Sequence, residues 1–321
     1  MTETVVFLDP MTPQRLAQIG ELAPEGWQLT TSTGRDEPAQ LAAIAEADFA
    51  VSGDVPVTAA MLRAAKRLKG VHKWGVGIDN FDTDAARALN IRMMRTTGSN
   101  AIPVAETAVS MMLALNRGLF PGHAGLGRGE WLKGTVGPGC LMLTGKTVGL
   151  IGLGAIGKSV VRLLSGFQCR VLYHMPRRLA AEEEAALGVE YASFDALLAE
   201  ADVVSLHCPL SAETRGLIGA AQLRAMKRSA VLINVARGGI VVEEELAAAL
   251  RAGEIRGAGV DVFATEPVPA DNPLLGLPNC IVTPHIGAAA ADNFAKTVSR
   301  MFRNMQHVAR GEEVPTLDVV V

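Results

Sequence analysis

Short β-branched runs alternate with Ala/Leu-rich stretches along the chain, and this alternation predicts the fold. The β-branched runs are bounded by Gly, Pro or Asp, whereas the stretches between them place apolar residues at helical spacing. In the first third of the chain we expect strands at residues 4–9, 49–52 and 71–74 and helices at residues 13–23, 38–47 and 58–68. This order is typical of βαβ units and a parallel sheet.

The middle of the chain interrupts the alternation. Residues 103–116 (PVAETAVSMMLALN) predict a long apolar helix, whereas residues 121–145 are rich in glycine and are expected to be irregular. Apolar residues such as Trp131 and Met142 lie among the polar turns of that segment. We therefore expect an arm that either caps a domain or packs on a second subunit.

From Lys146 onward the alternation becomes sharper. Strands are expected at residues 147–151, 170–173, 203–207, 231–235, 258–262 and 281–283, and a last helix is expected at residues 289–309. The pattern predicts two doubly wound α/β domains that meet near residues 98–101. We expect a first domain at residues 1–100, a second at residues 101–286, and a segment at residues 287–321 that returns to the first.

Composition narrows the class of protein. The chain has 321 residues, of which 49% are apolar and 20% charged, so it suffices for about two domains with large cores. A net charge of −3 without a basic run argues against binding to nucleic acid or a membrane surface. No signal peptide is evident, and we expect a cytoplasmic protein with reduced thiols and no metal site, because no CxxC pair or paired histidines occur.

The sequence Gly152-Leu-Gly154-Ala155-Ile156-Gly157 follows an expected strand and opens an expected helix. Gly152 would allow the tight turn, Gly154 would let a pyrophosphate approach the backbone, and Gly157 would let the helix pack on the strand. The amides of Ala155 and Ile156 would face the phosphates at the positive end of the helix. This context favours a dinucleotide site over a chance glycine-rich loop.

The end of the next strand bears on the choice between NAD and NADP. An acidic residue there would bind the ribose 2′-hydroxyl, but the chain has His174-Met-Pro-Arg177-Arg178 and no carboxylate before Glu182. Guanidinium groups bind phosphate in a bidentate manner, so we expect His174, Arg177 and Arg178 to contact the cofactor and to favour NADPH. The alternative is a solvated pair of arginines on an ordinary loop.

Three polar residues follow three later strands. Arg237 comes after the strand at 231–235, Glu266 after the strand at 258–262, and His285 after the strand at 281–283. Ligands bind outside the carboxyl ends of parallel strands, so these side chains are expected near the glycine turn. A guanidinium that binds a carboxylate, an imidazolium that donates a proton and a carboxylate that orients it suit the reduction of a 2-keto acid by a nicotinamide.

With these residues the chain resembles the D-isomer-specific 2-hydroxyacid dehydrogenases. The resemblance covers most of the chain and is carried by the motifs at residues 75–80 (GVGIDN), 98–100, 104–106, 152–157, 234–239 (NVARGG), 261–267 and 283–287 (TPHIG). It implies a Rossmann cofactor domain, a discontinuous flavodoxin-like substrate domain, and a homodimer formed through the segment at residues 118–145.

The resemblance also implies roles for individual residues. Arg237 would bind the substrate carboxylate and ketone oxygen, and His285 would be the acid in reduction and the base in oxidation. Val76 and Gly77 match the loop whose amides hold the carboxylate, and Asn100 is expected in the same substrate site. The remaining residues expected to line the cofactor are Cys208, Pro209, Thr214, Val235, Ala236, Asp261 and Gly287, with Asp261 holding the nicotinamide amide.

The leading hypothesis is an oxidoreductase that uses NADPH, with NAD as a second cofactor, to reduce a small 2-keto acid, with glyoxylate or hydroxypyruvate as first candidates. Ser52-Gly53-Asp54 stands where phosphoglycerate enzymes tend to carry arginine, which argues against 3-phosphoglycerate. The alternatives are an NAD-linked dehydrogenase of a larger D-2-hydroxy acid and a protein that senses nucleotides without turnover, similar to the corepressors that share this fold.

Overall fold

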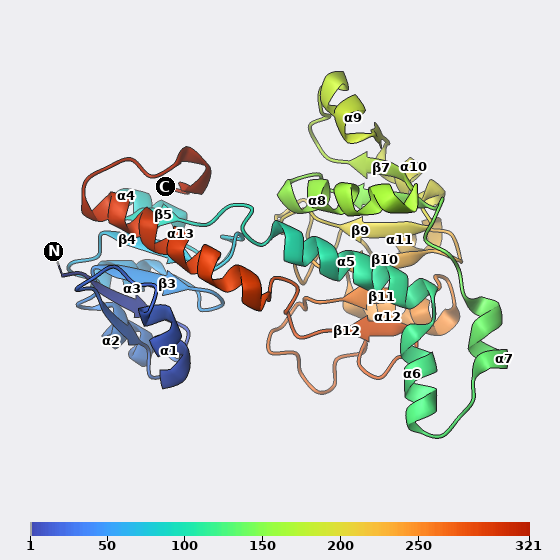
Figure 1. The fold of residues 1–321 in the computed structure, drawn as a ribbon, viewed down its shortest axis with the longest axis horizontal. Helices are drawn as coiled ribbons and strands as arrows, with labels where there is room; N and C mark the ends of the chain where they lie inside the picture. Colours follow the sequence, from blue (N-terminus) through green and yellow to red (C-terminus); the bar gives the residue numbers. More distant parts are fainter. Residues whose placement is uncertain (1) are drawn as a thin grey trace. The chain divides into compact units, whose positions relative to one another are not determined.

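The structure, a computed structural model that describes residues 2–321, divides into two compact units (Figure 1). Unit 1 consists of residues 2–100 and 290–321, and unit 2 of residues 101–289. Each unit holds one parallel sheet with helices on both faces, which confirms the predicted fold class. Unit 2 runs to Ala289 rather than to Ile286, because the amides of Ile286 and Gly287 are bound by Asp261.

Unit 1 has a sheet of five strands in the order β2-β1-β3-β4-β5. Its strands are β1 (Thr4–Phe7), β2 (Gln28–Thr31), β3 (Phe49–Ser52), β4 (Gly70–Lys73) and β5 (Arg92–Met94). Its helices are α1 (Pro13–Gly20), α2 (Glu37–Ile44), α3 (Ala59–Ala64), α4 (Thr83–Ala88) and α13 (Ala291–Ala309), followed by the 3₁₀ turn η3 (Thr316–Asp318).

Alternating side chains of β1 define the two faces of this sheet. Val6, together with Leu8 just after the strand, belongs to the core formed with α2, α3 and α4, whereas Val5 and Phe7 belong to the core formed with α1 and α13. On α13 the buried residues are Val298, Met301, Phe302, Asn304 and Met305, which recur at helical spacing. The C-terminal helix is therefore an integral layer of unit 1.

Unit 2 has a sheet of seven strands in the order β12-β11-β10-β9-β6-β7-β8. Its strands are β6 (Thr147–Ile151), β7 (Arg170–His174), β8 (Val189–Tyr191), β9 (Val203–Leu206), β10 (Val231–Asn234), β11 (Gly257–Val260) and β12 (Cys280–Val282). Its helices are α5 (Ala101–Asn116), α6 (Leu119–Gly127), α7 (Lys133–Val136), α8 (Ala155–Leu164), α9 (Ala181–Leu187), α10 (Phe194–Glu200), α11 (Ala220–Ala225) and α12 (Glu243–Ala252), with 3₁₀ turns η1 (Gly137–Gly139) and η2 (Ser165–Phe167).

The sheet of unit 2 is covered on both faces. Helices α5 and α8 pack on one face, and α10, α11 and α12 pack on the other. The central strands are buried throughout, as in β9 and β10. Parallel pairing brings the carboxyl ends of β6, β9, β10, β11 and β12 to one edge, which is where the expected site residues follow their strands.

Three strands were not expected from the sequence, namely β2, β5 and β8. All three are edge strands, and β5 and β8 contain only three residues each. In β2, the polar sequence QLTT leaves alternate residues exposed. Edge strands bury less surface than central ones, so the apolar pattern that identifies buried strands is weak there.

The segment expected to be irregular at residues 121–145 contains helical structure, which corrects that expectation. Helix α6 forms despite its three glycines, and α7 and η1 follow it. Gly125 is buried, and a Cβ at this position would overlap Cδ1 of Leu132. The close approach of Leu132 explains why a residue unfavourable to helices stands inside this one.

The described residues contain no helix that is both long and apolar enough to cross a membrane.

Two histidines, the fully buried His72 and the half-buried His207, make stability depend on pH. Burial lowers the pKa of His72 in unit 1 to about 4, and burial likewise lowers the pKa of His207 in unit 2 to about 4. Both rings are therefore neutral in the folded protein, whereas the unfolded chain protonates them at a pKa near 6.5. The folded state binds fewer protons in this window, so its stability falls as the pH drops from about 6.5 toward 4.

We expect each histidine to contribute on the order of 1 kcal/mol of lost stability per pH unit inside that window. Thermal unfolding followed by circular dichroism at a series of pH values measures the effect. In a variant carrying His72→Asn and His207→Asn, the decline of Tm between pH 6.5 and 4.5 should be shallower. An equal decline in the variant and the wild type would show that these rings do not cause it.

Candidate active site

The glycine turn at residues 152–157 connects β6 to α8. Gly152 has a φ of +96°, and a Cβ there would lie 2.7 Å from the carbonyl of His207. A Cβ on Gly157 would lie 2.7 Å from the carbonyl oxygen of Gly152, whereas nothing lies within 4 Å of the Cβ position on Gly154. The outer glycines are thus required by close packing of the backbone, and the middle one leaves an open cradle.

Helix α8 begins at this cradle without a side-chain cap, because its N-cap residue is Gly154. The amides of Ala155 and Ile156 in the first turn are therefore not used by a capping side chain. Backbone amides at the positive end of a helix bind phosphate well. The residues present fit the diphosphate of a dinucleotide cofactor.

Other residues expected at the cofactor follow the neighbouring strands. Cys208, Pro209 and Thr214 lie after β9, where the Thr214 hydroxyl donates to the carbonyl of Pro209 at 2.7 Å. Val235 and Ala236 directly follow β10. Each of these strands pairs, directly or through one neighbour, with β6, so the structure brings their ends to the edge that holds the glycine turn.

At the end of β7 the two arginines differ in their surroundings. Arg178 donates from Nε and Nη2 to the two oxygens of Glu184, at 2.8 Å each, and the buried Tyr173 hydroxyl donates to the same carboxylate at 2.6 Å. The bond from Arg178, followed by that from Tyr173, lowers the pKa of Glu184 to about 2. Arg177 is exposed and makes no hydrogen bond or ion pair with the described residues. His174, the last residue of β7, bonds through Nδ1 to the carbonyl of Ala192 at 3.0 Å.

Arg237, Glu266 and His285 lie on three loops of unit 2 that the fold brings together. Nδ1 of His285 lies 2.7 Å from Oε2 of Glu266, and the other carboxylate oxygen accepts from the amide of Phe263 at 2.8 Å. The positive charge of Arg237 lowers the pKa of both residues.

A glycine makes the approach of two of these loops possible. A Cβ on Gly238, the residue after Arg237, would overlap the carbonyl oxygen of Phe263. The loop after β10 therefore touches the loop that carries Glu266, and any side chain at this position would force them apart. Asn234 shapes the same loop, since it accepts from the Ala236 amide at 3.1 Å and donates to the Arg237 carbonyl at 3.0 Å.

His285 has an unusual backbone conformation that the surrounding residues hold in place. Its φ is +52°, a value that residues other than glycine seldom adopt. The buried carboxylate of Asp261 accepts from the amides of Ile286 at 3.0 Å and Gly287 at 2.8 Å, and its carbonyl accepts from the His285 amide at 2.8 Å. Asp261 thus anchors the loop, and strain of this kind is typical of functional sites.

The pKa values of His285 and Glu266 are shifted in the directions that suit acid–base chemistry. The hydrogen bond to Glu266 raises the pKa of His285 above its ordinary value, against the opposing effect of burial. Burial raises the pKa of Glu266, but the bonds from His285 and the Phe263 amide, with the charges of His285 and Arg237, outweigh it and leave this pKa below its ordinary value. The pair is therefore arranged as a carboxylate beside a histidine that protonates readily.

Glu243 and Asn272 contribute to the site, although the sequence did not single them out. Glu243, the first residue of α12, accepts from the amide of Ala264 and from the side-chain amide of Asn272, both at 2.6 Å. Asn272 is buried and also accepts from the Leu274 amide at 3.0 Å. These bonds fix the loop that carries Glu266. The only indication in the sequence is an acidic residue at a helix start, which is also what an ordinary helix favours.

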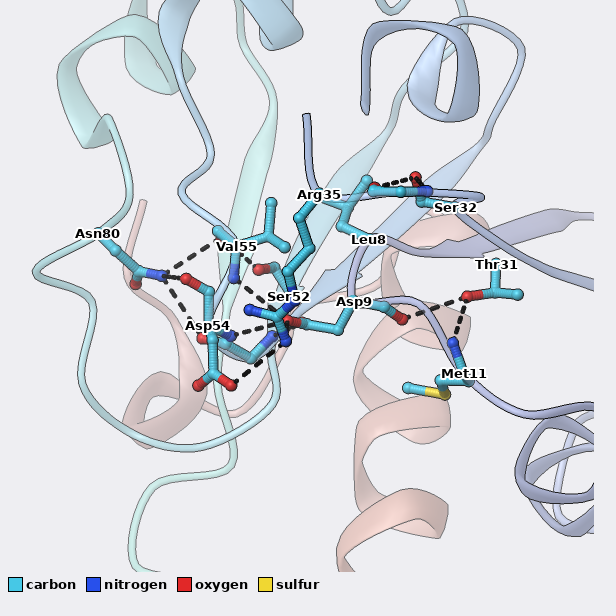
Figure 2. A network of polar contacts seen from close by, with 12 residues as sticks. Leu8, Asp9, Met11, Thr31, Ser32, Arg35, Ser52, Asp54, Val55 and Asn80 are labelled. Atoms are coloured by element: carbon cyan, nitrogen blue, oxygen red, sulfur yellow. Dashed lines mark hydrogen bonds and ion pairs between the residues drawn. The ribbon is translucent and has the colours of Figure 1, made fainter. Parts of the chain in front are cut away.

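The residues expected to bind substrate through backbone amides lie in unit 1. The carboxylate of Asp9 accepts from the amides of residues 53–55 at 2.6, 3.2 and 3.3 Å and pairs with Arg35 at 3.2 Å (Figure 2). Asn80 donates to the carbonyls of the same three residues, at 3.2 to 3.4 Å. Since Asn80 ends the expected carboxylate-binding loop at 75–80, the two loops form one fixed edge of the unit 1 sheet.

Lys73 reinforces this edge from the end of β4. It is only 7% exposed, and Nζ donates to the carbonyl of Gly53 and, at 2.9 Å, to Oδ1 of Asn80. Val76 and Gly77 lie three and four residues after Lys73 and are half-buried. Asn100 lies at the last position of the first segment of unit 1, and its Oδ1 is buried without a hydrogen-bond partner among the described residues.

Metal ligands are not grouped in the described part of the chain: no three His, Cys, Asp or Glu residues there are placed to hold an ion.

The chain is similar to proteins of one known family. Residues 109–287 match the family model described as "D-isomer specific 2-hydroxyacid dehydrogenase, NAD binding domain". The chain is 38% identical over 312 residues to a D-3-phosphoglycerate dehydrogenase of Mycobacterium leprae (strain TN), a match that covers 97% of this chain and 58% of that protein. The chain thus spans about three fifths of the length of the relative.

Two further matches cover most of both chains. The chain is 38% identical over 266 residues to a glyoxylate reductase of Korarchaeum cryptofilum (strain OPF8), covering 82% of this chain and 79% of that one. Among solved structures, the TT0316 protein from Thermus thermophilus is 33% identical, with a TM-score of 0.86 and coverage of 99% of this chain and 100% of that one.

The histidine–carboxylate pair allows a direct test. Because Glu266 is the main cause of the raised pKa of His285, Glu266→Gln should lower that pKa, and NMR titration of the histidine ring signals measures it. Glu254→Gln, at a half-buried position on the loop after α12, is a matched control that removes one carboxylate elsewhere in unit 2. An unchanged titration of His285 in the Glu266 variant would contradict the proposed coupling.

Proposed function

This chain belongs to the D-isomer-specific 2-hydroxyacid dehydrogenase family, and on that premise we propose that it transfers a hydride between a nicotinamide cofactor and a small 2-keto acid. The favoured direction is reduction with NADPH, and glyoxylate and hydroxypyruvate are the first candidate substrates. The observation that carries the proposal is the 2.7 Å contact between His285 and Glu266, beside Arg237 and at the sheet edge that holds the glycine turn.

In this proposal each side chain has one task in the reduction. Arg237 binds the substrate carboxylate and polarises the adjacent ketone, and the amides of Val76 and Gly77 bind the same carboxylate. A nicotinamide cofactor held at the glycine turn would supply the hydride for the carbonyl carbon. His285 donates the proton from Nε2 to the ketone oxygen, because Nδ1 is held by Glu266, and the product is a 2-hydroxy acid.

Glu266 keeps the imidazole in the required state. Its carboxylate stays ionised because its pKa lies below the ordinary value, and it stabilises the charged ring before the proton leaves. In the reverse direction the neutral ring accepts the proton from the hydroxyl group. Reduction therefore needs the protonated ring, and oxidation needs the neutral one.

The unit 1 edge supports a small substrate without phosphate. The carboxylate of Asp54 is 70% exposed there, and Asp9 already occupies the amides of residues 53–55. The cation Lys73 is bonded to Gly53 and Asn80. A phosphate dianion at this edge would meet the carboxylates of Asp9 and Asp54, which already share the cation Arg35. This favours glyoxylate or hydroxypyruvate over the phosphorylated acid named for the mycobacterial relative.

The coenzyme preference is proposed to depend on Arg177. Met175 and Pro176 offer no carboxylate for a ribose 2′-hydroxyl, and the carboxylate of Glu184 is taken by Arg178 and Tyr173. Arg177 is exposed on the same loop and suits a 2′-phosphate. Arg178 has a structural partner, so its share in binding the phosphate is the smaller one.

We also propose that the chain forms a homodimer through the segment at residues 118–145. Five of the large apolar side chains that are exposed in the described structure lie there, and Trp131 is 79% exposed. The five are Leu119, Phe120, Leu126, Trp131 and Met142. An exposed apolar group of this size on one segment is typical of a surface that a protein partner covers.

A panel of 2-keto acids tests the activity. With NADPH, glyoxylate and hydroxypyruvate should be reduced with higher kcat/KM than phosphohydroxypyruvate, as followed by loss of reduced coenzyme absorbance. Loss of the acid in His285→Ala should lower kcat by about 10²- to 10⁴-fold while coenzyme affinity stays near that of the wild type. Reduction should decline as the pH rises through the raised pKa of His285, and oxidation should increase. Unchanged turnover in His285→Ala would disprove the acid assignment.

Substitutions on the β7–α9 loop test the coenzyme preference. Arg177→Gln should raise KM for NADPH about tenfold or more and leave KM for NADH unchanged, because only the 2′-phosphate loses a charged partner. Arg178→Gln should affect both coenzymes similarly, since it disturbs the loop through Glu184. A wild type that uses NADH as well as NADPH would refute the preference itself.

A further inference from the structure

Arg95 follows β5 in unit 1 and has an incomplete set of hydrogen bonds. Its Nη1 donates to the carbonyl of Val76 at 3.2 Å, whereas its Nε is buried without a partner among the described residues. No carboxylate pairs with it in the described part of the chain. Placing a half-buried guanidinium without a counter-charge lowers the stability of the folded state, which suggests that Arg95 has a function other than stabilising the fold.

Arg300 shows how a structural arginine of the same unit is satisfied. Its Nε and Nη2 donate to the two oxygens of the buried Asp318, at 2.8 and 2.6 Å, and its Nη1 donates to the carbonyl of Thr97 at 3.1 Å. Arg95 has no comparable set of partners. The one side-chain bond that Arg95 makes to a described residue goes to the loop that the proposed function assigns to the substrate carboxylate.

The backbone of Arg95 is itself held firmly. Its amide donates to the carbonyl of Asp318 at 2.9 Å, and its carbonyl accepts from the Asn304 side chain at 3.4 Å. Met94, the residue before it, pairs with His72 of β4 and forms a bridge with Val319. The guanidinium therefore contacts the loop after β4 from a backbone position that hydrogen bonds hold in place.

The bond from Arg95 to the Val76 carbonyl also affects the N–H group of Gly77. The carbonyl oxygen of Val76 and the N–H of Gly77 belong to one planar trans peptide, in which they point in opposite directions. Arg95 on the oxygen therefore fixes the direction of the N–H group. A charged donor on the carbonyl also polarises the peptide, so the N–H becomes a stronger donor to an anion.

We propose that Arg95 is a positioning residue for the substrate carboxylate, acting through the peptide that joins Val76 to Gly77. This inference rests on the proposed function, which assigns that carboxylate to the amides of Val76 and Gly77. Arg95 orients and polarises the Gly77 amide, and its unpaired charge compensates the anion. Its effect falls on substrate binding and not on proton transfer at His285.

Three variants separate this role from general stability. Arg95→Gln keeps a donor without the charge, and Arg95→Lys restores the charge. Arg92→Gln removes one charge from an exposed position at the start of β5, the strand that Arg95 follows. Arg95→Gln should raise KM for glyoxylate about tenfold with kcat nearly unchanged. Arg95→Lys should recover part of the affinity, and Arg92→Gln should match the wild type. Equal Tm values for the variants exclude a folding defect as the cause.

Binding of oxamate, a carboxylate that resembles the substrate, tests the inference without turnover. Calorimetry in the presence of saturating NADPH should show about tenfold weaker oxamate binding by Arg95→Gln and unchanged affinity for NADPH alone. Weaker oxamate binding in a protein that reduces no 2-keto acid would support Arg95 and refute the proposed reaction. Normal oxamate binding and normal KM in Arg95→Gln would overturn the role of Arg95 alone. Absence of oxamate binding by the wild type would count against both.

Discussion

The hydrogen bond of 2.7 Å between His285 and Glu266 is the interaction on which the proposed chemistry depends. It joins the loops that follow β12 and β11, which are neighbouring parallel strands. The register of these two strands therefore determines how close the two side chains lie. The carboxylates of Asp261 and Glu243 hold those loops by accepting hydrogen bonds from their backbone amides. The orientation of the pair thus depends on several loops at this edge of the sheet, because hydrogen bonds to other residues fix the backbone that carries each side chain.

Burial explains which parts of the fold were predictable from the sequence. Central strands such as β10 are buried on both faces and are mostly apolar, as in the run Val231–Ile233, which the sequence displays directly. The edge strands β2, β5 and β8 lack this pattern, and helix α6 forms where its glycines argue against a helix. In these places tertiary contacts decide the conformation, and one sequence does not contain them in recognisable form.

The site shows the same division. Arg237, Glu266 and His285 were predictable because each follows a strand, and the rule of the carboxyl edge needs only strand positions. The partner of each charged side chain was not predictable. Arg177 and Arg178 are adjacent and alike in sequence, yet only Arg178 is bound by Glu184. Glu243 is one of three consecutive glutamates, and only the folded loop shows which amides it accepts from.

The placement of α13 has a consequence for how the polypeptide is made. Unit 1 needs this helix to cover one face of its sheet, whereas unit 2 consists of one continuous segment that precedes it. On the ribosome, the later part of the chain can therefore reach its final structure before the earlier part. The apolar surface of the N-terminal strands stays uncovered until residues 291–309 emerge. During this period a chaperone could bind that surface.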